Sequence, residues 1–552
     1  MKKFALTVCA LALCLGAFAQ PGAMPENVIL TARANNPIQY GGPTRAEGRS
    51  YNFTPLFFIY PDGKVDKAGA EALLKELDIQ SLLDSDYGTA MVVNPVGDKD
   101  AAEADFDVFV KLFNASRGPG NLKVVGIGQG ATFVNQVVAP KAGGQIADIL
   151  TVGGKPGKSV DPAGVPAYVA GKGAAKVAKP YQAARAAHAD EPLLKVVVDP
   201  AQAPLKEVFA DAWKQVLGRN YRYNNYNHTH YEGAQFGQYG SYELEPYLDC
   251  ESLGIKRIIV EQPVGMAQRG QEPPKQLWYE YWPEELLAGA PAQSVPVMVL
   301  LHGNQNDPRT QAETSGFIQL AGEKRFFVVE MEWQGSPNYQ AMGHDGVETV
   351  LFQLFAKYPQ LDPSRVYAEG LSAGSSTATA LGIKKSHVFT AVGGHSGGIF
   401  GGPRNNYSTF AQLWAEATQK RGAVEVPYCS VFGTKDNVVP YIKPDNWKDN
   451  NYLNAWNAYE QMNGMEVVRE MDFSVDPVFA QRLRDRETIV TNKGDGIVVE
   501  TGRLYKGDIP MIKLVAVMDY GHWNFMPTAR IMWDFFSHYR RDPETKKLIY
   551  IP

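Results

Sequence analysis

A serine with the spacing of a catalytic nucleophile lies in Gly370–Gly374 (GLSAG), two residues from a glycine on either side. The preceding Val366–Ala368 is short and apolar, as expected of a buried strand, and the following Ser375–Leu381 is small and compatible with a helix. In a strand–turn–helix context this spacing is typical of a nucleophile elbow, whose glycines let the strained turn pack against its neighbours. We therefore predict that Ser372 is a nucleophile presented at the edge of a sheet.

The same spacing recurs in Gly394–Gly398 (GHSGG), but in a different context. It follows the apolar run Val388–Val392 and precedes Ile399–Pro403 (IFGGP). Proline and paired glycines prevent an immediate helix. We interpret this second copy as the loop after the next strand, and not as a second nucleophile.

A serine nucleophile needs a base, and His522 is the best-placed histidine downstream of Ser372. It follows the strand-like Lys513–Val517 and a short turn ending in glycine, where the base of such a site is expected. By contrast, His387 follows two lysines and a serine at a predicted helix end, and His538 lies in an amphipathic terminal helix.

The acid that orients this base is predicted to be Asp436. It follows the strand-like Ser430–Gly433 and would leave the carboxyl end of that strand, where open α/β sheets keep their sites. Asp519 is the alternative, but it shares one short loop with the histidine that it would have to orient.

Backbone donors for an oxyanion are expected from two loops. The apolar Val297–Leu301 runs directly into His302-Gly303-Asn304, beside the predicted elbow. We expect the N–H groups of Ala373 and Asn304 to stabilise negative charge on a substrate oxygen.

Three tryptophans fall in predicted loops, where their rings could stack on a sugar or an aromatic group, or could pack in the core. They are Trp333, Trp447 and Trp523.

Asp362–Tyr367 together with the elbow, Leu301–Asn304 and Gly433–Pro440 resemble the polyhydroxybutyrate depolymerase and feruloyl esterase group of α/β hydrolases. The resemblance spans roughly residues 290 to 540. It implies a secreted serine esterase without a metal or organic cofactor, acting on a small-molecule ester or an acyl or hydroxycinnamoyl ester of a plant-type polysaccharide. The chain departs from the family at Asn304, where the family has cysteine, and after His522, where Trp523 and Asn524 replace a Ser-Trp-Pro-like run.

Other functions remain open at this point. A polyester depolymerase of the polyhydroxyalkanoate type is compatible with the same resemblance. A non-catalytic carbohydrate-binding protein built from two hydrolase-like domains, and a peptidase, are also compatible with the sequence.

The two halves of the chain repeat one pattern of apolar strands and helices, which predicts an α/β protein of two tandem α/β-hydrolase-like domains, each a mostly parallel sheet flanked by helices. For example, Pro55–Tyr60 corresponds to Pro296–Leu301, and Leu194–Val198 corresponds to Ile512–Ala516. The expected organisation is a signal peptide at 1–19, a leader at 20–50 with a strand at 28–31, a degenerate domain at 51–222, a linker at 223–240 and a catalytic domain at 241–552.

The chemical groups of the second half are missing from the first. Asp62, with its neighbours Pro61 and Gly63, replaces the His-Gly-Asn run, Gly128 replaces the serine, and the acid and base positions fall near Ala174 and Gln202. We therefore expect the first domain to have no catalytic function.

A dinucleotide fingerprint is the competing interpretation of the same glycines. Gly126-Ile-Gly128-Gln-Gly-Ala131 fits its spacing, and Asp148 lies about twenty residues beyond Gly128. Because two strand candidates and a helix precede it, whereas the fingerprint normally opens its domain, we favour the degenerate elbow.

Composition limits the binding partners that we expect. The 552 residues are 20% charged with a net charge of −5, which gives no reason to expect nucleic acid as a partner.

The N-terminal sequence predicts the cellular compartment. Residues 1–19 combine a charged start, an apolar run and a small-residue cleavage site, so export to the periplasm or the outside is expected; a lipoprotein anchored through Cys14 is the alternative. We see no later run long enough to span a membrane. Oligomeric state, and whether Cys250 and Cys429 form a disulfide or two thiols, stay open.

Overall fold

The computed structural model describes residues 24–35, 54–86, 88–96, 102–116, 120–223, 236–237, 243–264, 273–304, 306, 308–335, 339–399, 424–436, 438–467, 470–491 and 497–552. The chain forms two compact units, and the division between them falls between Tyr247 and Leu248. The predicted signal peptide at 1–19 and most of the predicted linker at 223–240 lie outside the described residues.

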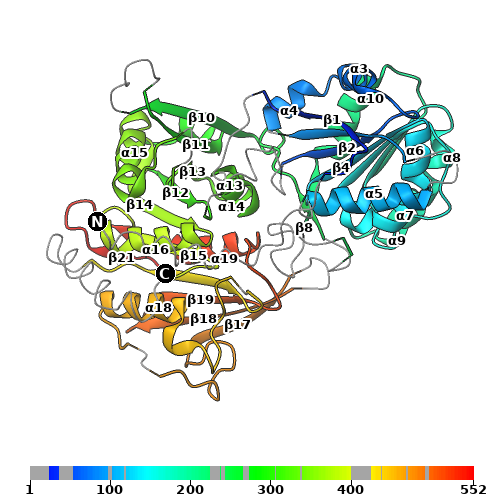
Figure 1. The fold of residues 1–552 in the computed structure, drawn as a ribbon. Helices are drawn as coiled ribbons and strands as arrows, with labels where there is room; N and C mark the ends of the chain where they lie inside the picture. The colour runs from blue at the N-terminus through cyan, green and yellow to red at the C-terminus, as the bar shows by residue number, and fades with distance from the viewer. Residues whose placement is uncertain are drawn as a thin grey trace, which may run out of the picture. The chain divides into compact units, whose positions relative to one another are not determined.

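The first unit contains a seven-stranded sheet in the order β1-β3-β2-β4-β5-β6-β7 (Figure 1). All neighbouring strands pair in parallel except β1, which is antiparallel to β3. Part of the predicted leader is therefore an edge strand of this sheet. The strands are β1 (Val28–Arg33), β2 (Leu56–Tyr60), β3 (Thr89–Val93), β4 (Leu122–Ile127), β5 (Asp148–Val152), β6 (Ala167–Ala170) and β7 (Val196–Asp199).

Helices cover both faces of this sheet because its strands are apolar on both sides. Along β2, Phe58 and its alternate neighbours face one core, which is closed by α5 and α7–α9, whereas Phe57 and Ile59 face the other, which is closed by α3, α4 and α10. The helical elements are α3 (Lys67–Leu77), α4 (Gln80–Asp86), α5 (Ala102–Ala115), α6 (Gln129–Phe133), the π-helical turn η1 (Val134–Val138), α7 (Ala139–Ala142), the 3₁₀ turn η2 (Gly143–Gln145), α8 (Ala174–Val177), α9 (Lys179–Ala187), α10 (Leu205–Ala212) and the π-helical turn η3 (Trp213–Leu217).

The second unit contains a ten-stranded sheet in the order β10-β11-β13-β12-β14-β15-β16-β19-β18-β17. Its centre, from β13 to β19, is parallel, and antiparallel strands extend it at both ends. The strands are β10 (Ile255–Pro263), β11 (Lys275–Pro283), β12 (Val295–Leu301), β13 (Phe327–Met331), β14 (Leu361–Gly370), β15 (Ala391–His395), β16 (Tyr428–Gly433), β17 (Arg484–Val490), β18 (Val498–Lys506) and β19 (Ile509–Val517).

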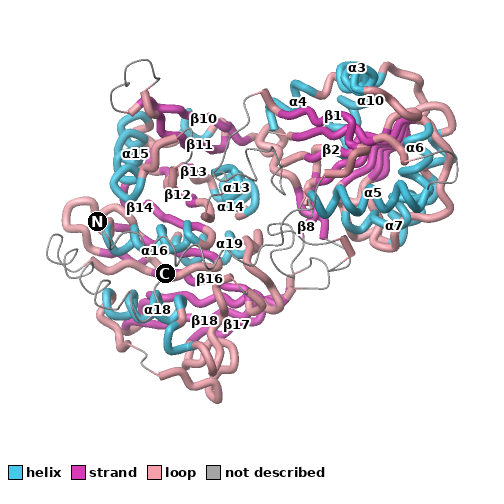
Figure 2. Tube along the Cα trace, viewed as in Figure 1, coloured by secondary structure: helices cyan, strands magenta, loops and turns pink. Residues whose placement is uncertain are grey.

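In the second unit α15, α16 and α18 lie along one face of the sheet, and α13, α14 and α19 lie along the other, as Figures 1 and 2 show. The helices are α12 (Leu286–Gly289), α13 (Pro308–Thr314), α14 (Phe317–Lys324), α15 (Gly343–Lys357), α16 (Ala373–Lys384), the 3₁₀ turn η4 (Trp447–Asp449), α18 (Asn451–Met462) and α19 (Thr528–Phe536). Two small antiparallel pairs complete the described strands: β8 (Asn220–Tyr223) with β9 (Glu243–Pro246), and β20 (Tyr539–Arg541) with β21 (Leu548–Tyr550).

The shared strand order confirms the predicted fold of two α/β domains. In each unit the second parallel strand along the chain, β3 or β13, is the outermost strand of the parallel set. The first, β2 or β12, lies next to it, and the remaining parallel strands follow in sequence order. The predicted pairs β2 with β12 and β7 with β19 occupy equivalent places in the two sheets.

Two further findings concern membranes and cysteines. Within the part of the chain that the structure describes, no helix combines the length and hydropathy needed to cross a bilayer. Cys250 and Cys429 are two free thiols, and Cys429 is buried in β16.

Candidate active site

Ser372 lies in the strained turn that the sequence predicts. Strand β14 ends at Gly370, helix α16 begins at Ala373, and Ser372 between them has φ 55° and ψ −114°. This conformation is rarely adopted by a residue with a side chain, and backbone strain of this kind costs on the order of 1–3 kcal/mol. The Ser372 N–H donates to the carbonyl oxygen of His395 at 2.8 Å, which holds the turn against β15.

The glycines flanking the serine are required by close backbone contacts. A Cβ atom on Gly374 would lie 2.0 Å from the carbonyl oxygen of Leu301, and one on Gly370 would lie 2.4 Å from the carbonyl carbon of Gly374. No side chain fits at either position, so the two glycines allow α16 to begin directly against the end of β12.

Asp436 and His522 form a buried hydrogen-bonded pair. Nδ1 of His522 is 2.8 Å from Oδ2 of Asp436, and the two residues are only 2% and 5% exposed. The other carboxylate oxygen accepts the N–H groups of Val438 and Val439 at 2.9 and 2.8 Å. The carboxylate is therefore held by the backbone on one side and by the imidazole on the other.

The loops that carry Asp436 and His522 are joined by two hydrogen bonds from backbone N–H groups. The N–H of Lys435 donates to the carbonyl oxygen of Tyr520 at 2.9 Å, and the N–H of Asp519 donates to Oγ1 of Thr434 at 2.8 Å. The alternative acid, Asp519, turns outward instead: its side chain is exposed and pairs with Nζ of Lys435 at 3.1 Å.

The sheet order brings all three predicted catalytic residues to one edge. Ser372 follows β14, Asp436 follows β16 and His522 follows β19, and the adjacent strands run in the order β14-β15-β16-β19. The carboxyl ends of parallel strands share an edge, so residues far apart in the chain lie in one region.

His395, at the end of the intervening β15, is a site residue that sequence reasoning missed. Its ring is buried, and its Nε2 has no hydrogen-bond partner among the described residues. Burial, together with the nearby His522, lowers the pKa of His395 to about 3, so this imidazole is neutral at ordinary pH. The glycine-rich sequence around His395 predicts a loop. Only the order of the strands shows that this loop lies between Ser372 and Asp436. Ser396, beside it, is fully buried.

The loop after β12, predicted to supply an oxyanion donor, is anchored by the two residues that directly follow β13. His302 is buried, with Nε2 3.2 Å from Oε1 of Glu332, and Nε1 of Trp333 donates to the His302 carbonyl oxygen at 2.9 Å. The same Glu332 oxygen accepts the N–H of Gly335 at 2.9 Å. Glu332 is a second residue that sequence reasoning missed, although a glutamate directly after an apolar strand is a usable signal.

The residues proposed for substrate stacking have different surroundings. Trp333 is half-buried and its indole N–H is committed to His302, whereas Trp523 is 2% exposed and offers little ring surface. Asn304 is exposed, and its side-chain oxygen accepts a hydrogen bond from Gln334 at 2.5 Å.

A buried polar network supports the loop of His522. Nδ2 of Asn524 donates to Gln311 at 2.9 Å and to Thr314 at 2.8 Å, and Nε2 of Gln311 donates to the carboxyl group of Glu369 at 2.7 and 2.9 Å. Burial raises the pKa of Glu369 to about 8, against the effect of the Gln311 hydrogen bonds. The departure from the family pattern at Asn524 thus has a structural role, linking the histidine loop to α13.

The first unit has the same strand–turn–helix elbow as the second, but a carboxylate lies where the serine side chain would be. Gly128 lies between β4 and α6 with φ 53° and ψ −110°, and the next N–H, of Gln129, donates to Oδ1 of Asp62 at 2.8 Å. A Cβ on Gly128 would lie 2.3 Å from the Asp62 carboxyl group. The carboxylate thus occupies the space that a serine side chain would need.

Asp148 does not fit the dinucleotide interpretation. It begins β5, is fully buried, and forms an ion pair with Nζ of Lys123 at 2.5 Å. A ribose-binding carboxylate belongs at the opposite, carboxyl end of the strands. This observation leaves the degenerate elbow as the explanation of the glycines around Gly128.

Metal ligation has no candidate cluster in the described residues. Within them, no group of three or more histidine, cysteine, aspartate or glutamate side chains is placed to hold a metal ion.

Comparison with known proteins supports the resemblance expected from the sequence. Residues 281–427 match the model of the family described as esterase PHB depolymerase. The search of curated proteins gave no match.

Solved structures similar to this chain include three α/β hydrolases. The acetyl xylan esterase from Aspergillus awamori is 15% identical, with 51% of this chain and 99% of that chain covered and a TM-score of 0.34. A mutant feruloyl esterase module from Clostridium thermocellum, complexed with sinapinate, is 13% identical, with 51% and 87% covered and a TM-score of 0.32. The Pyrococcus horikoshii acylaminoacyl peptidase is 14% identical, with 41% and 40% covered and a TM-score of 0.28.

Proposed function

We propose, from the match of residues 281–427 to the esterase PHB depolymerase family, that this carboxyl ester hydrolase is an exported serine carboxylesterase. Its substrates are acyl or hydroxycinnamoyl esters, of the acetyl or feruloyl type, carried by a polysaccharide. The observation that carries the proposal is the buried 2.8 Å contact between Asp436 and His522, at the sheet edge that also bears the strained Ser372 turn.

In the proposed reaction, Oγ of Ser372 attacks the ester carbonyl carbon while Nε2 of His522 takes the hydroxyl proton. Asp436 binds the Nδ1 side of the ring, which fixes the tautomer and stabilises the imidazolium that forms. The N–H groups of Ala373 and Asn304 stabilise the tetrahedral oxyanion, and the loss of one such donor typically costs about 10²–10³ in rate.

His522 then gives this proton to the leaving alcohol, and the acyl group stays on Ser372. In the second half of the reaction, water attacks the acyl-enzyme with His522 as base. His522 returns the proton taken from water to Oγ of Ser372 as the bond to the acyl carbon breaks and the carboxylic acid leaves. No other reactant is needed.

The first domain has a different task in this proposal, because its elbow carries Gly128 in place of the serine and its adjacent N–H is bound by Asp62. We assign it no catalytic step. Export through residues 1–19 belongs to the same proposal and rests on their sequence pattern alone.

The test is turnover of p-nitrophenyl acetate and methyl ferulate by the wild type, Ser372→Ala and Ser396→Ala. Ser396 is the matched control because it is the serine of the second GxSxG run. We expect Ser372→Ala to lose activity and fluorophosphonate labelling and Ser396→Ala to keep both. Equal rates for wild type and Ser372→Ala would end the proposal.

Polyhydroxybutyrate is the second candidate substrate, because the matching family takes its description from that polymer's depolymerases. Release of hydroxybutyrate from polymer films, measured beside methyl ferulate hydrolysis, separates a polyester depolymerase from a polysaccharide-directed esterase.

A further inference from the structure

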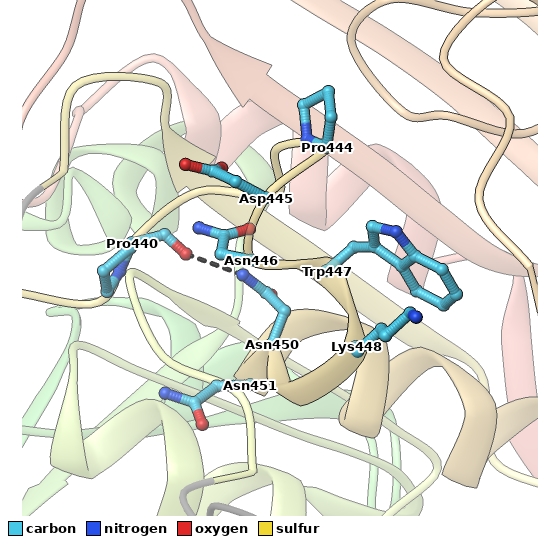
Figure 3. Close-up of a pocket in the computed structure, with 8 residues that line it drawn as sticks. All are labelled: Pro440, Pro444, Asp445, Asn446, Trp447, Lys448, Asn450 and Asn451. Carbon is cyan, nitrogen blue, oxygen red and sulfur yellow. Dashed lines mark hydrogen bonds between the residues drawn. The ribbon is translucent and has the colours of Figure 1, made fainter.

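A cavity of about 570 Å³ lies in the second unit, where the loop after Asp436 leads into α18. Figure 3 shows the indole of Trp447 and the side chain of Lys448 on one side and the side chains of Asp445 and Asn451 on the other. The volume is within the ~300–1,000 Å³ typical of small-molecule sites. Nothing in the proposed ester chemistry uses this space.

Two connections place the cavity beside the catalytic residues. Pro440, in its wall, is four residues beyond Asp436. The carbonyl oxygen of Asn451, also in the wall, accepts the N–H of Ile399 at 3.1 Å. Ile399 belongs to the loop after β15, and in this loop a Cβ on Gly397 would lie 2.8 Å from the Ser372 carbonyl oxygen.

The wall of the cavity is held in place by its own amides. Nδ2 of Asn450 donates to the Pro440 carbonyl oxygen at 2.9 Å, as the dashed line in Figure 3 marks, and its Oδ1 accepts the N–H of Tyr452 at 2.9 Å. Asn446 is fixed in the same way, through Tyr441 and Lys443. A preformed wall lowers the entropy cost of binding a ligand.

Three polar side chains remain for a ligand. Within the described part of the chain, Asp445, Lys448 and Asn451 make no side-chain hydrogen bond. Together they present donors and acceptors, and the charges of Asp445 and Lys448 balance.

Trp447 supplies an aromatic wall. It packs against the hydrophobic core and remains half-buried, and Nζ of Lys448 lies 5.6 Å from the ring centroid. A flat aromatic surface beside hydroxyl-binding donors and acceptors fits a neutral sugar, which has an apolar ring face and a hydroxyl rim. Asp445 disfavours an anion, and an apolar acyl chain would leave the polar groups unpaired.

We propose that this cavity is a glycan subsite in which Trp447 stacks on one sugar ring and Asp445, Lys448 and Asn451 bind its hydroxyl groups. The site holds the chain that carries the ester, next to the residues that cleave it. This inference deepens the proposed function, and rests on it for the role of the sugar, but binding itself does not require catalysis.

The test measures binding of xylohexaose and cellohexaose by calorimetry in a full-length Ser372→Ala background, where no ester is turned over. We expect Trp447→Ala to weaken binding at least tenfold and Asp445→Ala at least threefold. Phe352→Ala is the matched control, because Phe352 is 53% exposed on α15 and is not among the residues that line the cavity, so this variant should bind like its parent.

A second measurement separates the subsite from the ester chemistry. With Ser372 intact, Trp447→Ala should retain wild-type turnover of p-nitrophenyl acetate while KM for an acylated oligosaccharide increases at least tenfold. The inference is overturned if neither oligosaccharide binds the parent, or if both cavity variants bind as tightly as the Phe352 control. If the wild type binds the sugars but hydrolyses no ester, the proposed function fails and the subsite stands.

Discussion

Gly128 and Ser372 adopt the same backbone conformation at equivalent places in the two sheets, with φ and ψ of 53° and −110° in one and 55° and −114° in the other. One position has no side chain and the other carries the nucleophile that we propose. The turn therefore persists in both units, while its chemistry differs with the residue placed on it and with Asp62, which binds the N–H beside Gly128.

We expect Gly128→Ala to destabilise the first unit by about 2–5 kcal/mol. The new Cβ would meet Asp62 at 2.3 Å, so overpacking adds to the backbone strain. Gly153→Ala is the control, since Gly153 has φ 72° and a Cβ added there would meet nothing within 4 Å, so that this variant should cost only about 1 kcal/mol. Thermal unfolding by circular dichroism measures both.

The contribution of the clash can be isolated by combining Gly128→Ala with Asp62→Ala. We expect the double variant to be more stable than the sum of the two single effects, because the contact is then absent. Strict additivity would show that Asp62 does not restrict Gly128.

Asp436→Asn should lower kcat by about 10⁴ with little change in fold. The asparagine oxygen can still accept the N–H groups of Val438 and Val439, but its amide would face Nδ1 of His522 and favour the wrong tautomer. Asp519→Asn should hydrolyse p-nitrophenyl acetate at close to the wild-type rate, since Asp519 pairs with Lys435 on the outside. The reverse ranking would reassign the acid.

Trp333→Phe should lower kcat about two- to tenfold while keeping an aromatic ring at this position. It removes the 2.9 Å hydrogen bond to the His302 carbonyl oxygen, at a cost of about 0.5–1.5 kcal/mol, and loosens the loop proposed to bind the oxyanion. Trp447→Phe, on the cavity side, should leave turnover of small esters unchanged. A Trp333→Phe enzyme with normal kcat would remove this tryptophan from the catalytic machinery.

The acid limb of the pH profile of kcat/KM should fall with a slope of one. Burial and the nearby His522 lower the pKa of His395 to about 3, so this imidazole contributes no proton to the acid limb above about pH 4. A slope of two between pH 4 and 7 would show that both rings titrate together.

Glu369→Gln should become progressively more stable than the wild type as pH rises from about 4.5 to about 8. In this window the unfolded wild type releases the Glu369 proton while the folded protein, with its pKa raised to about 8 by burial, keeps it. At about 1.4 kcal/mol per pKa unit the difference reaches a few kcal/mol at most.

Denaturant unfolding at several pH values measures this difference, and Glu323→Gln is the contrasting control. Glu323 is exposed, and its hydrogen bonds with Arg530 lower its pKa to about 2, so its variant should differ from the wild type by a constant amount between pH 5 and 8. A constant difference for Glu369→Gln as well would mean that this carboxyl is ionised throughout.

Local sequence determined those parts of the protein that depend on short-range constraints. The spacing of Gly370, Ser372 and Gly374 predicts the elbow because backbone contacts at two Cβ positions exclude every other residue there. Continuous apolar runs in strands such as β2 predict two buried faces, and hence helices on both sides of each sheet.

Tertiary structure alone decided which distant groups meet. Asp436 contacts His522 because β16 and β19 are neighbours, and His395 lies among the site residues because β15 fills the place between β14 and β16. The link from Asn524 through Gln311 to Glu369, the Asp62 carboxylate beside Gly128 and the cavity at Trp447 likewise depend on contacts between separate segments. The pattern of apolar residues along a strand predicts which of its faces are buried. The order of the strands and the packing of the loops determine which residues those faces, and the ends of the strands, contact.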